Sequence, residues 1–115
     1  MRFMMLMIPK GYETAARDVK PDAKAMAEMR KYNDALRKAG ILLSVDGLQP
    51  PVSGARLSFK GGKATVRQGP FPEVNETLGG YWIIEVKSQE DAIEWASRCP
   101  ASDTEVVEVR QMAGD

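Results

Sequence analysis

The sequence predicts one α+β domain in which a strand-helix-strand unit occurs twice. Short apolar runs alternate with two segments whose apolar residues recur at helical spacing. The pair Gly61-Gly62 divides two segments of alternating polarity and indicates a β-hairpin between the two units. A length of 115 residues is typical of a single domain.

The first unit is expected to contain a strand over residues 3–8, a helix over 21–39 and a strand over 41–45. The continuous apolar run 3–8 is typical of a strand that is covered on both faces. Pro21 suits the first position of a helix, and Gly40 suits its C-terminal cap.

The hairpin is expected to pair residues 56–60 with residues 63–67. This register places Leu57 opposite Val66 and Phe59 opposite Ala64 on an apolar face. It places like charges opposite each other on the second face, which destabilises a strand pair. We expect these cations either to be solvated or to meet carboxylates of the downstream loop or a bound anion; they are Arg56, Lys60, Lys63 and Arg67.

The second unit follows a proline-containing loop over residues 68–75. A strand is expected over 81–86, a helix from a Ser88 cap to Cys99, and a last strand over 104–111. We therefore expect one domain over residues 1–111, followed by a C-terminal tail over residues 112–115.

Right-handed crossovers would place both helices on one face of an antiparallel sheet, in the ferredoxin-like arrangement. The other face of the sheet would then lack a cover within the chain. An apolar sheet face of this kind needs a partner, so the pattern predicts a symmetric homodimer with sheet packed against sheet.

Composition argues against several classes of function. The 16 basic and 16 acidic residues cancel, which does not favour a nucleic-acid partner. The N-terminal apolar run is too short for a membrane helix and lacks a cleavage site, so no membrane association is expected. With no histidine and only Cys99, no metal and no cofactor is expected, and a cytoplasmic location fits best.

Several segments together resemble the DGPF-domain branch of the YCII-related family. They are Asp46–Pro51, Gln68–Glu73, Leu78–Tyr81, Trp95–Pro100 and Val107–Arg110. The resemblance implies a dimeric α+β barrel of ferredoxin-like protomers. It implies no particular reaction, because the role of most such proteins is unassigned; members are often encoded near sigma factors, which hints at regulation.

Two departures from the family pattern limit what the resemblance implies. The branch is named for an Asp at the position of Gln68, and an amide cannot exchange a proton as a carboxylate can. Some YCII relatives have a proposed His-Asp pair, but this chain contains no histidine. An activity that depends on that pair is therefore not carried over.

The loop after the hairpin supplies most candidate site residues. A ligand is expected to meet Gln68, Gly69, Pro70, Phe71 and Tyr81, with the alternative that Phe71 fills the core or a dimer interface.

Glu73 and Glu76 are candidates for proton chemistry, with Tyr81 as a hydrogen-bond donor to a substrate. The carboxylates could instead neutralise the arginines of the hairpin. Cys99 is expected to be structural because it ends a helix and has no histidine partner.

The sequence thus favours a homodimeric binding or regulatory module with a small, aromatic or anionic ligand. The alternative is a cofactor-independent enzyme of isomerase, lyase or oxygenase type that uses a Glu base in the cleft. A purely structural role is the third hypothesis.

Overall fold

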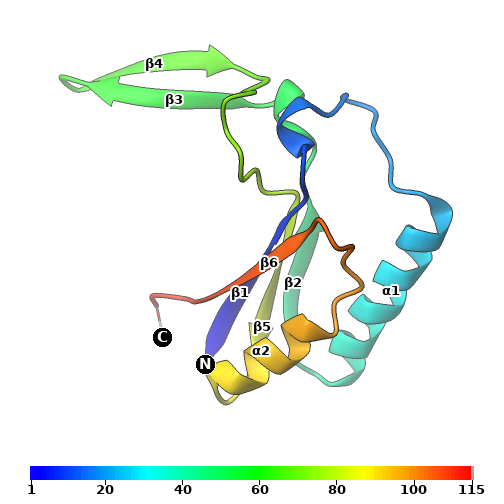
Figure 1. Cartoon of the computed structure of the whole chain (residues 1–115). Helices are drawn as coiled ribbons and strands as arrows, with labels where there is room; N and C mark the ends of the chain where they lie inside the picture. Colours follow the sequence, from blue (N-terminus) through cyan, green and yellow to red (C-terminus); the bar gives the residue numbers. More distant parts are fainter. Residues whose placement is uncertain (115) are drawn as a thin grey trace.

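The computed structural model describes residues 1–114, and a four-stranded antiparallel sheet forms the body of the protein (Figure 1). The strand order is β2-β5-β1-β6, and each neighbouring pair is antiparallel. The strands are β1 (Arg2–Ile8), β2 (Leu42–Gly47), β5 (Gly80–Glu85) and β6 (Val106–Gln111). This order is consistent with the ferredoxin-like arrangement, and the predicted α+β class is confirmed.

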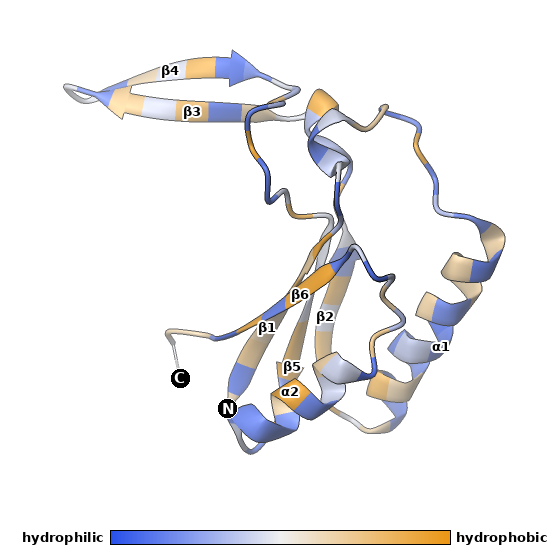
Figure 2. Cartoon of the chain, viewed as in Figure 1, coloured by the Kyte–Doolittle hydropathy of each residue, from blue (hydrophilic) through white to orange (hydrophobic). Residues whose placement is uncertain are grey.

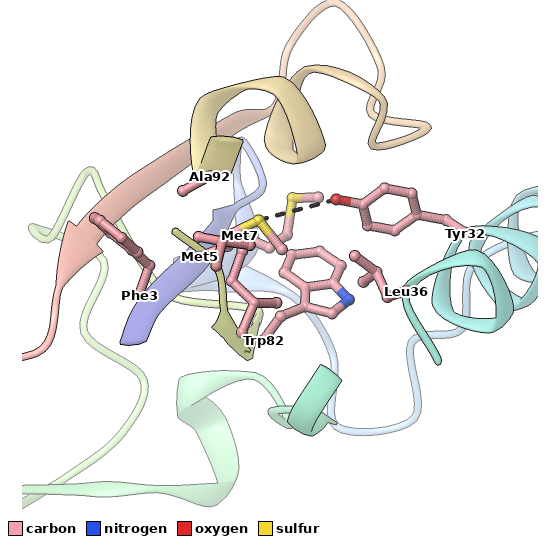
Figure 3. Packing of buried hydrophobic residues seen from close by; sticks show 9 residues of the cluster. Phe3, Met5, Met7, Tyr32, Leu36, Trp82 and Ala92 are labelled. Carbon is pink, nitrogen blue, oxygen red and sulfur yellow. Dashed lines mark hydrogen bonds between the residues drawn. The ribbon is translucent and has the colours of Figure 1, made fainter. Parts of the chain in front are cut away.

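Two α-helices lie on one face of this sheet, α1 (Ala23–Lys38) and α2 (Gln89–Ser97). The core between the layers is built from alternate residues of β1 and β5 and from the inner faces of both helices (Figure 3). Its fully buried side chains include Phe3, Met5, Leu36, Ile84 and Ala92. The strand over residues 3–8 was expected to be covered on both faces, but within the protomer only one face is covered.

The uncovered face of the sheet carries the other alternate residues of the central strands. Met4, Leu6 and Ile8 of β1 and Ile83 of β5 are only half-buried there. No helix covers this face among the described residues, because α1 and α2 both pack on the opposite one. We call this surface the open face.

The helix α1 begins two residues later than the sequence pattern predicted. Asp22 is the N-cap, and its carboxylate accepts a hydrogen bond from the backbone N–H of Ala25 at 2.7 Å. The backbone of Asp22 is extended, so its side chain can accept a hydrogen bond from a free N–H group in the first helical turn. Pro21 therefore lies before the cap and outside the helix. At the other end Gly40 follows the helix with a φ of +73°, as its predicted capping role requires.

The last strand also begins later than expected, at Val106 rather than Thr104. A turn occupies the preceding residues, in which the Ser102 N–H donates to the Glu105 carboxylate at 2.8 Å. The strand pairing continues beyond Gln111, since the Met112 N–H donates to the Arg2 carbonyl at 2.9 Å. Of the expected tail, Asp115 lies outside the described residues.

The hairpin of β3 (Ala55–Lys60) and β4 (Lys63–Gln68) forms a separate two-stranded sheet, which we call the arm. Its observed register is the predicted one, including Phe59 opposite Ala64 and the like-charged pairs. A short 3-10 helix, η2 (Pro51–Ser53), leads into it. The arm projects from the end of the sheet to the side away from α1 (Figure 1).

No helix among residues 1–114 is both long enough and apolar enough to cross a membrane.

Candidate functional site

A cavity of about 600 Å³ opens between α1, the segment 9–21 and the ends of β2 and β5. This volume lies in the range of pockets that hold small organic ligands. Apolar side chains supply most of the wall, from the sheet and from the helix; they are Met7, Val45, Trp82, Met26 and Met29. The cavity therefore lies on the helix side of the sheet.

Gly79 closes one edge of the cavity by joining the ends of two strands. Its N–H donates to the Met7 carbonyl at 2.8 Å, and its carbonyl accepts from the Leu48 N–H at 2.9 Å. A Cβ atom at this position would lie 2.8 Å from Cγ of Pro9, so a side chain would not fit without movement. The glycine allows the segment after β1 to pass close to the start of β5.

The Trp82 indole forms one wall and is held in place by α1. Its Nε1–H donates to Asn33 Oδ1 at 2.8 Å, and its ring meets the Tyr32 ring edge to face with centroids 5.7 Å apart. Tyr32 in turn donates from its hydroxyl to the Trp95 carbonyl at 2.6 Å, which links α1 to α2. Because the indole occupies Asn33 Oδ1, the amide nitrogen of Asn33 is available to a ligand at the cavity wall.

Two cations border the cavity without a carboxylate partner. Lys20 and Arg30 both line it, and neither forms an ion pair with any residue between 1 and 114. Asp46 and Glu105 are the acidic residues of the lining. Glu105 is engaged as the acceptor for the Ser102 N–H. The lining thus combines apolar walls with the ammonium group of Lys20 and the guanidinium group of Arg30, both of which can bind an anion.

Several apolar side chains around this cavity are incompletely buried. Val19 is 48% exposed, Met26 is 43% exposed and Leu48 is 42% exposed, although all three line the cavity. A bound molecule with apolar surface would remove part of this area from water, which is favourable at about 25 cal/mol per Å².

Tyr81 is the one predicted site residue that borders the cavity, but its side chain does not point to the helix side of the sheet, where the cavity lies. It alternates with Trp82 along β5 and pairs with Asp46, so its side chain belongs to the open face of the sheet. Its hydroxyl lies 3.5 Å from Ser44 Oγ.

The predicted ligand-binding loop lies elsewhere, at the base of the arm. The Gly69 N–H donates to the Gly54 carbonyl at 2.9 Å, and a Cβ at Gly69 would lie only 1.7 Å from the Pro51 carbonyl oxygen. Gln68 ends β4 and is exposed, and Pro70 is exposed as well. The structure therefore separates Gln68–Phe71 from the cavity.

Phe71 is 6% exposed and is covered by two arginines of the arm. The guanidinium carbons of Arg56 and Arg67 lie 5.4 Å and 5.3 Å from its ring centroid. Such cation–π contacts stabilise at about 0.5–1 kcal/mol each at exposed sites. Phe71 thus packs against the charged face of the arm and lies outside the main core, which was one of the two positions expected for a structural Phe71.

Glu73 binds one of the two arginines that cover Phe71. Both of its oxygens accept from Arg67, at 2.6 Å and 2.8 Å, in a bidentate pair. The hydrogen bonds from Arg67 lower the pKa of Glu73 to about 2. Its side chain is 53% exposed, and Glu76 is exposed too. The structure brings neither carboxylate to the cavity, and this position for Glu73 matches the expected neutralisation of the arm's arginines.

Cys99 is half-buried beneath the end of α2. Burial, with a smaller contribution from the Glu105 carboxylate, raises its pKa to about 11. The thiolate is therefore scarce near neutral pH, which is consistent with a structural role. Among residues 1–114, no three acidic, histidine or cysteine side chains gather into a group that could hold a metal ion.

Apart from Tyr81, the residues of the cavity were not recognised as site residues from the sequence. Lys20 and Arg30 look like ordinary surface cations, and Asn33 and Trp82 look like helix and strand residues. Arg30, Asn33 and Trp82 come together because α1 packs on β5, and Lys20 joins them through the path of segment 9–21. No local pattern indicates either arrangement. The position of Gly79-Gly80 at the start of a strand was the one local signal of a close approach there.

Comparison with known proteins gives a family assignment over nearly the whole chain. The chain is 30% identical over 83 residues to the uncharacterized protein R00369 of Rhizobium meliloti (strain 1021), which covers 72% of this chain and 67% of that protein. The YCII-related domain model matches residues 1–113. The protein therefore belongs to the YCII-related family.

Proposed function

We propose that the protein is a homodimeric binding module whose ligand is a small organic anion with an apolar or aromatic body. The observation that supports this most directly is the cavity lined by Trp82 and two methionines of α1, with Lys20 and Arg30 at its border and no ion pair to either within residues 1–114. The apolar body of such a ligand would cover the exposed apolar walls. The carboxylate of the ligand would accept hydrogen bonds from Arg30, because the planar guanidinium group matches the geometry of a carboxylate.

The wall also offers a neutral donor near the indole. The amide nitrogen of Asn33 is held in place because Trp82 fixes the amide oxygen. A donor whose position is set before binding loses little conformational freedom when the ligand arrives. The arrangement favours a ligand that carries an acceptor group next to a flat ring.

The homodimer is proposed to form through the open face, giving the two-sheet barrel that the family resemblance implies. Apolar residues of β1 and β5 lie on that face without a helix over them. Tyr81 and Ser44 lie on the same face, so they would border the space between the two sheets. Within this proposal the protein belongs to the DGPF branch and acts in the cytoplasm.

A cofactor-independent enzyme with a Glu base is less well supported. Glu73 is paired with Arg67, and a pKa of about 2 makes it a weak base near neutral pH. Glu76 is exposed and does not border the cavity. We therefore propose binding without chemistry.

A titration with matched ligands tests the proposal. Isothermal calorimetry compares benzoate, phenylacetate and indole-3-acetate with the corresponding amides, which keep the ring and lose the charge. We expect at least one acid to bind and its amide to bind more weakly. Arg30→Gln should weaken the acid about tenfold or more, because a charged hydrogen bond contributes about 1.5–3 kcal/mol.

Lys31→Gln is the matched control for this experiment. Lys31 is the next residue of α1 and an exposed cation, but it does not line the cavity. Equal affinity for acids and amides, or equal losses in the two variants, would contradict the proposed anion site. No binding by any of the probes would remove the support for this ligand class.

A further inference from the structure

The arm is an amphipathic element whose two faces differ in chemistry. Cross-strand pairing places four apolar side chains on one face and the four cations on the other. Figure 2 shows the alternation of apolar and polar residues along both strands. The four apolar residues near the tip of this face are Leu57, Phe59, Ala64 and Val66, and the pair of Ala55 and Gln68 lies on the same face at its base.

This apolar face is uncovered in the protomer. Every residue of β3 and β4 is exposed, and Phe59 is 74% exposed. Leu57 and Val66 are 52% and 57% exposed. A two-stranded hairpin without a packing surface is marginally stable in water, so an arm of this composition needs a surface to cover it.

The arm is nevertheless held in a fixed direction at its base. Arg56 and Arg67 of its charged face pack on the buried Phe71, and Glu73 binds Arg67 with two hydrogen bonds. Since Phe71 contacts the charged face, the apolar face lies on the opposite side of the ribbon. An element that is anchored in this way loses little conformational entropy when its apolar residues dock on a partner.

The protomer exposes more surface than a compact monomer of its size. A monomer of 12.7 kDa is expected to expose about 6,200 Å², whereas this chain exposes 7923 Å². The excess of about 1,700 Å² per chain corresponds to the large interfaces of obligate homodimers. The radius of gyration is 15.8 Å, compared with about 13 Å for a compact domain of this length.

We propose that the arm is a clasp that packs its apolar face on the second protomer of the homodimer. This inference rests on the homodimer proposed above and assigns to the arm a part of that interface. A second copy is favoured over a nucleic acid or an anionic lipid surface, because the chain has no net charge and the large side chains on the uncovered face away from Phe71 are apolar. Packing through the apolar face also leaves intact the contacts of Arg56 and Arg67 with Phe71 and of Arg67 with Glu73.

Two neighbouring substitutions on opposite faces of β3 test the clasp. Phe59→Glu places a charge on the apolar face, and Ser58→Glu places the same charge on the cationic face. We expect Phe59→Glu to raise the Kd of the dimer at least about tenfold in sedimentation velocity, as for a buried aromatic at an interface. Ser58→Glu should leave the Kd unchanged within about a factor of two. Circular dichroism and thermal unfolding of the diluted protein check that both variants fold.

A cross-linking measurement tests the same contact without destabilising it. p-Benzoylphenylalanine at position 59 is irradiated in a mixture of ¹⁵N-labelled and unlabelled chains. We expect cross-links between labelled and unlabelled chains that disappear on dilution below the Kd. Cross-links only within one chain would overturn the clasp.

The outcomes separate the clasp from the homodimer itself. A dimer whose Kd is the same in the native chain and in Phe59→Glu overturns the clasp and leaves the homodimer standing. A native chain that stays monomeric at micromolar concentration overturns both. Binding of phosphatidylglycerol vesicles or of duplex DNA that Phe59→Glu abolishes, with dimerisation unaffected, assigns the arm to that partner and also overturns the clasp.

Discussion

Gly69 shows how a single residue fixes the position of the arm. Its N–H donates to the carbonyl of Gly54, the residue between η2 and β3, and its Cα lies against the backbone of η2. The Pro51 carbonyl oxygen occupies the space where any other residue would have its Cβ. Close backbone packing thus accounts for the glycine in the segment Gln68–Glu73, which resembles a family motif.

Gly69→Ala is expected to destabilise the protein by about 1–3 kcal/mol, because the added methyl group clashes with backbone that cannot rotate away. Chemical denaturation at constant temperature measures the loss in free energy of unfolding. Gly54→Ala is the control, since its Cβ would meet the Pro51 carbonyl oxygen at an ordinary 3.5 Å. Equal stability of the two variants would show that the base of the arm tolerates a side chain.

The α1 helix is the element that connects local sequence to the cavity. Asp22 caps its first turn, and the following residues Ala25 and Met26 line the cavity. A cap that holds the first turn therefore also holds one wall of the candidate site. The sequence pattern found this helix and its C-terminal end, but it assigned the start to Pro21, one residue before the cap.

Asp22→Ala should lower the free energy of unfolding by about 1 kcal/mol, the typical effect of losing an N-cap side chain. Asp22→Ser should restore most of this loss, because a hydroxyl can accept the same hydrogen bond from the Ala25 N–H. Urea denaturation followed by circular dichroism gives both values. If Asp22→Ser is as unstable as Asp22→Ala, the stabilisation comes from the charge at the helix dipole and not from the cap.

The elements of this fold were predictable where a local rule determines them. The two glycines of the hairpin turn both have positive φ, 57° and 79°, and the register of the arm follows from that turn. The bulge of β2 between Leu42 and Ser44 was not predictable, because it depends on the fit of β2 to β5. The cavity was missed for the same reason: Arg30 and Trp82 meet through the packing of α1 on β5, and Lys20 joins them through the path of segment 9–21.

At the scale of the whole molecule, apolar residues remain uncovered in two separate places. The open face of the sheet and the apolar face of the arm belong to different sheets, and the arm extends from the end of the body (Figure 1). A compact monomer would fold such an arm back over its own core. Two protomers related by a twofold axis would instead cover both surfaces of each chain at once.

Ile83→Glu tests the part of this interface that the arm does not supply. Ile83 is half-buried in the centre of the open face, between Met4 and Ser44 on the neighbouring strands. A carboxylate there would have to leave water when a second sheet packs on it, which costs several kcal/mol unless it finds a partner. We therefore expect Ile83→Glu to convert the proposed dimer into a monomer at micromolar concentration in sedimentation equilibrium. Ile93→Glu, at a 51% exposed isoleucine of α2 outside the sheet, should leave the dimer intact, and the open face is not the interface if both variants remain dimeric.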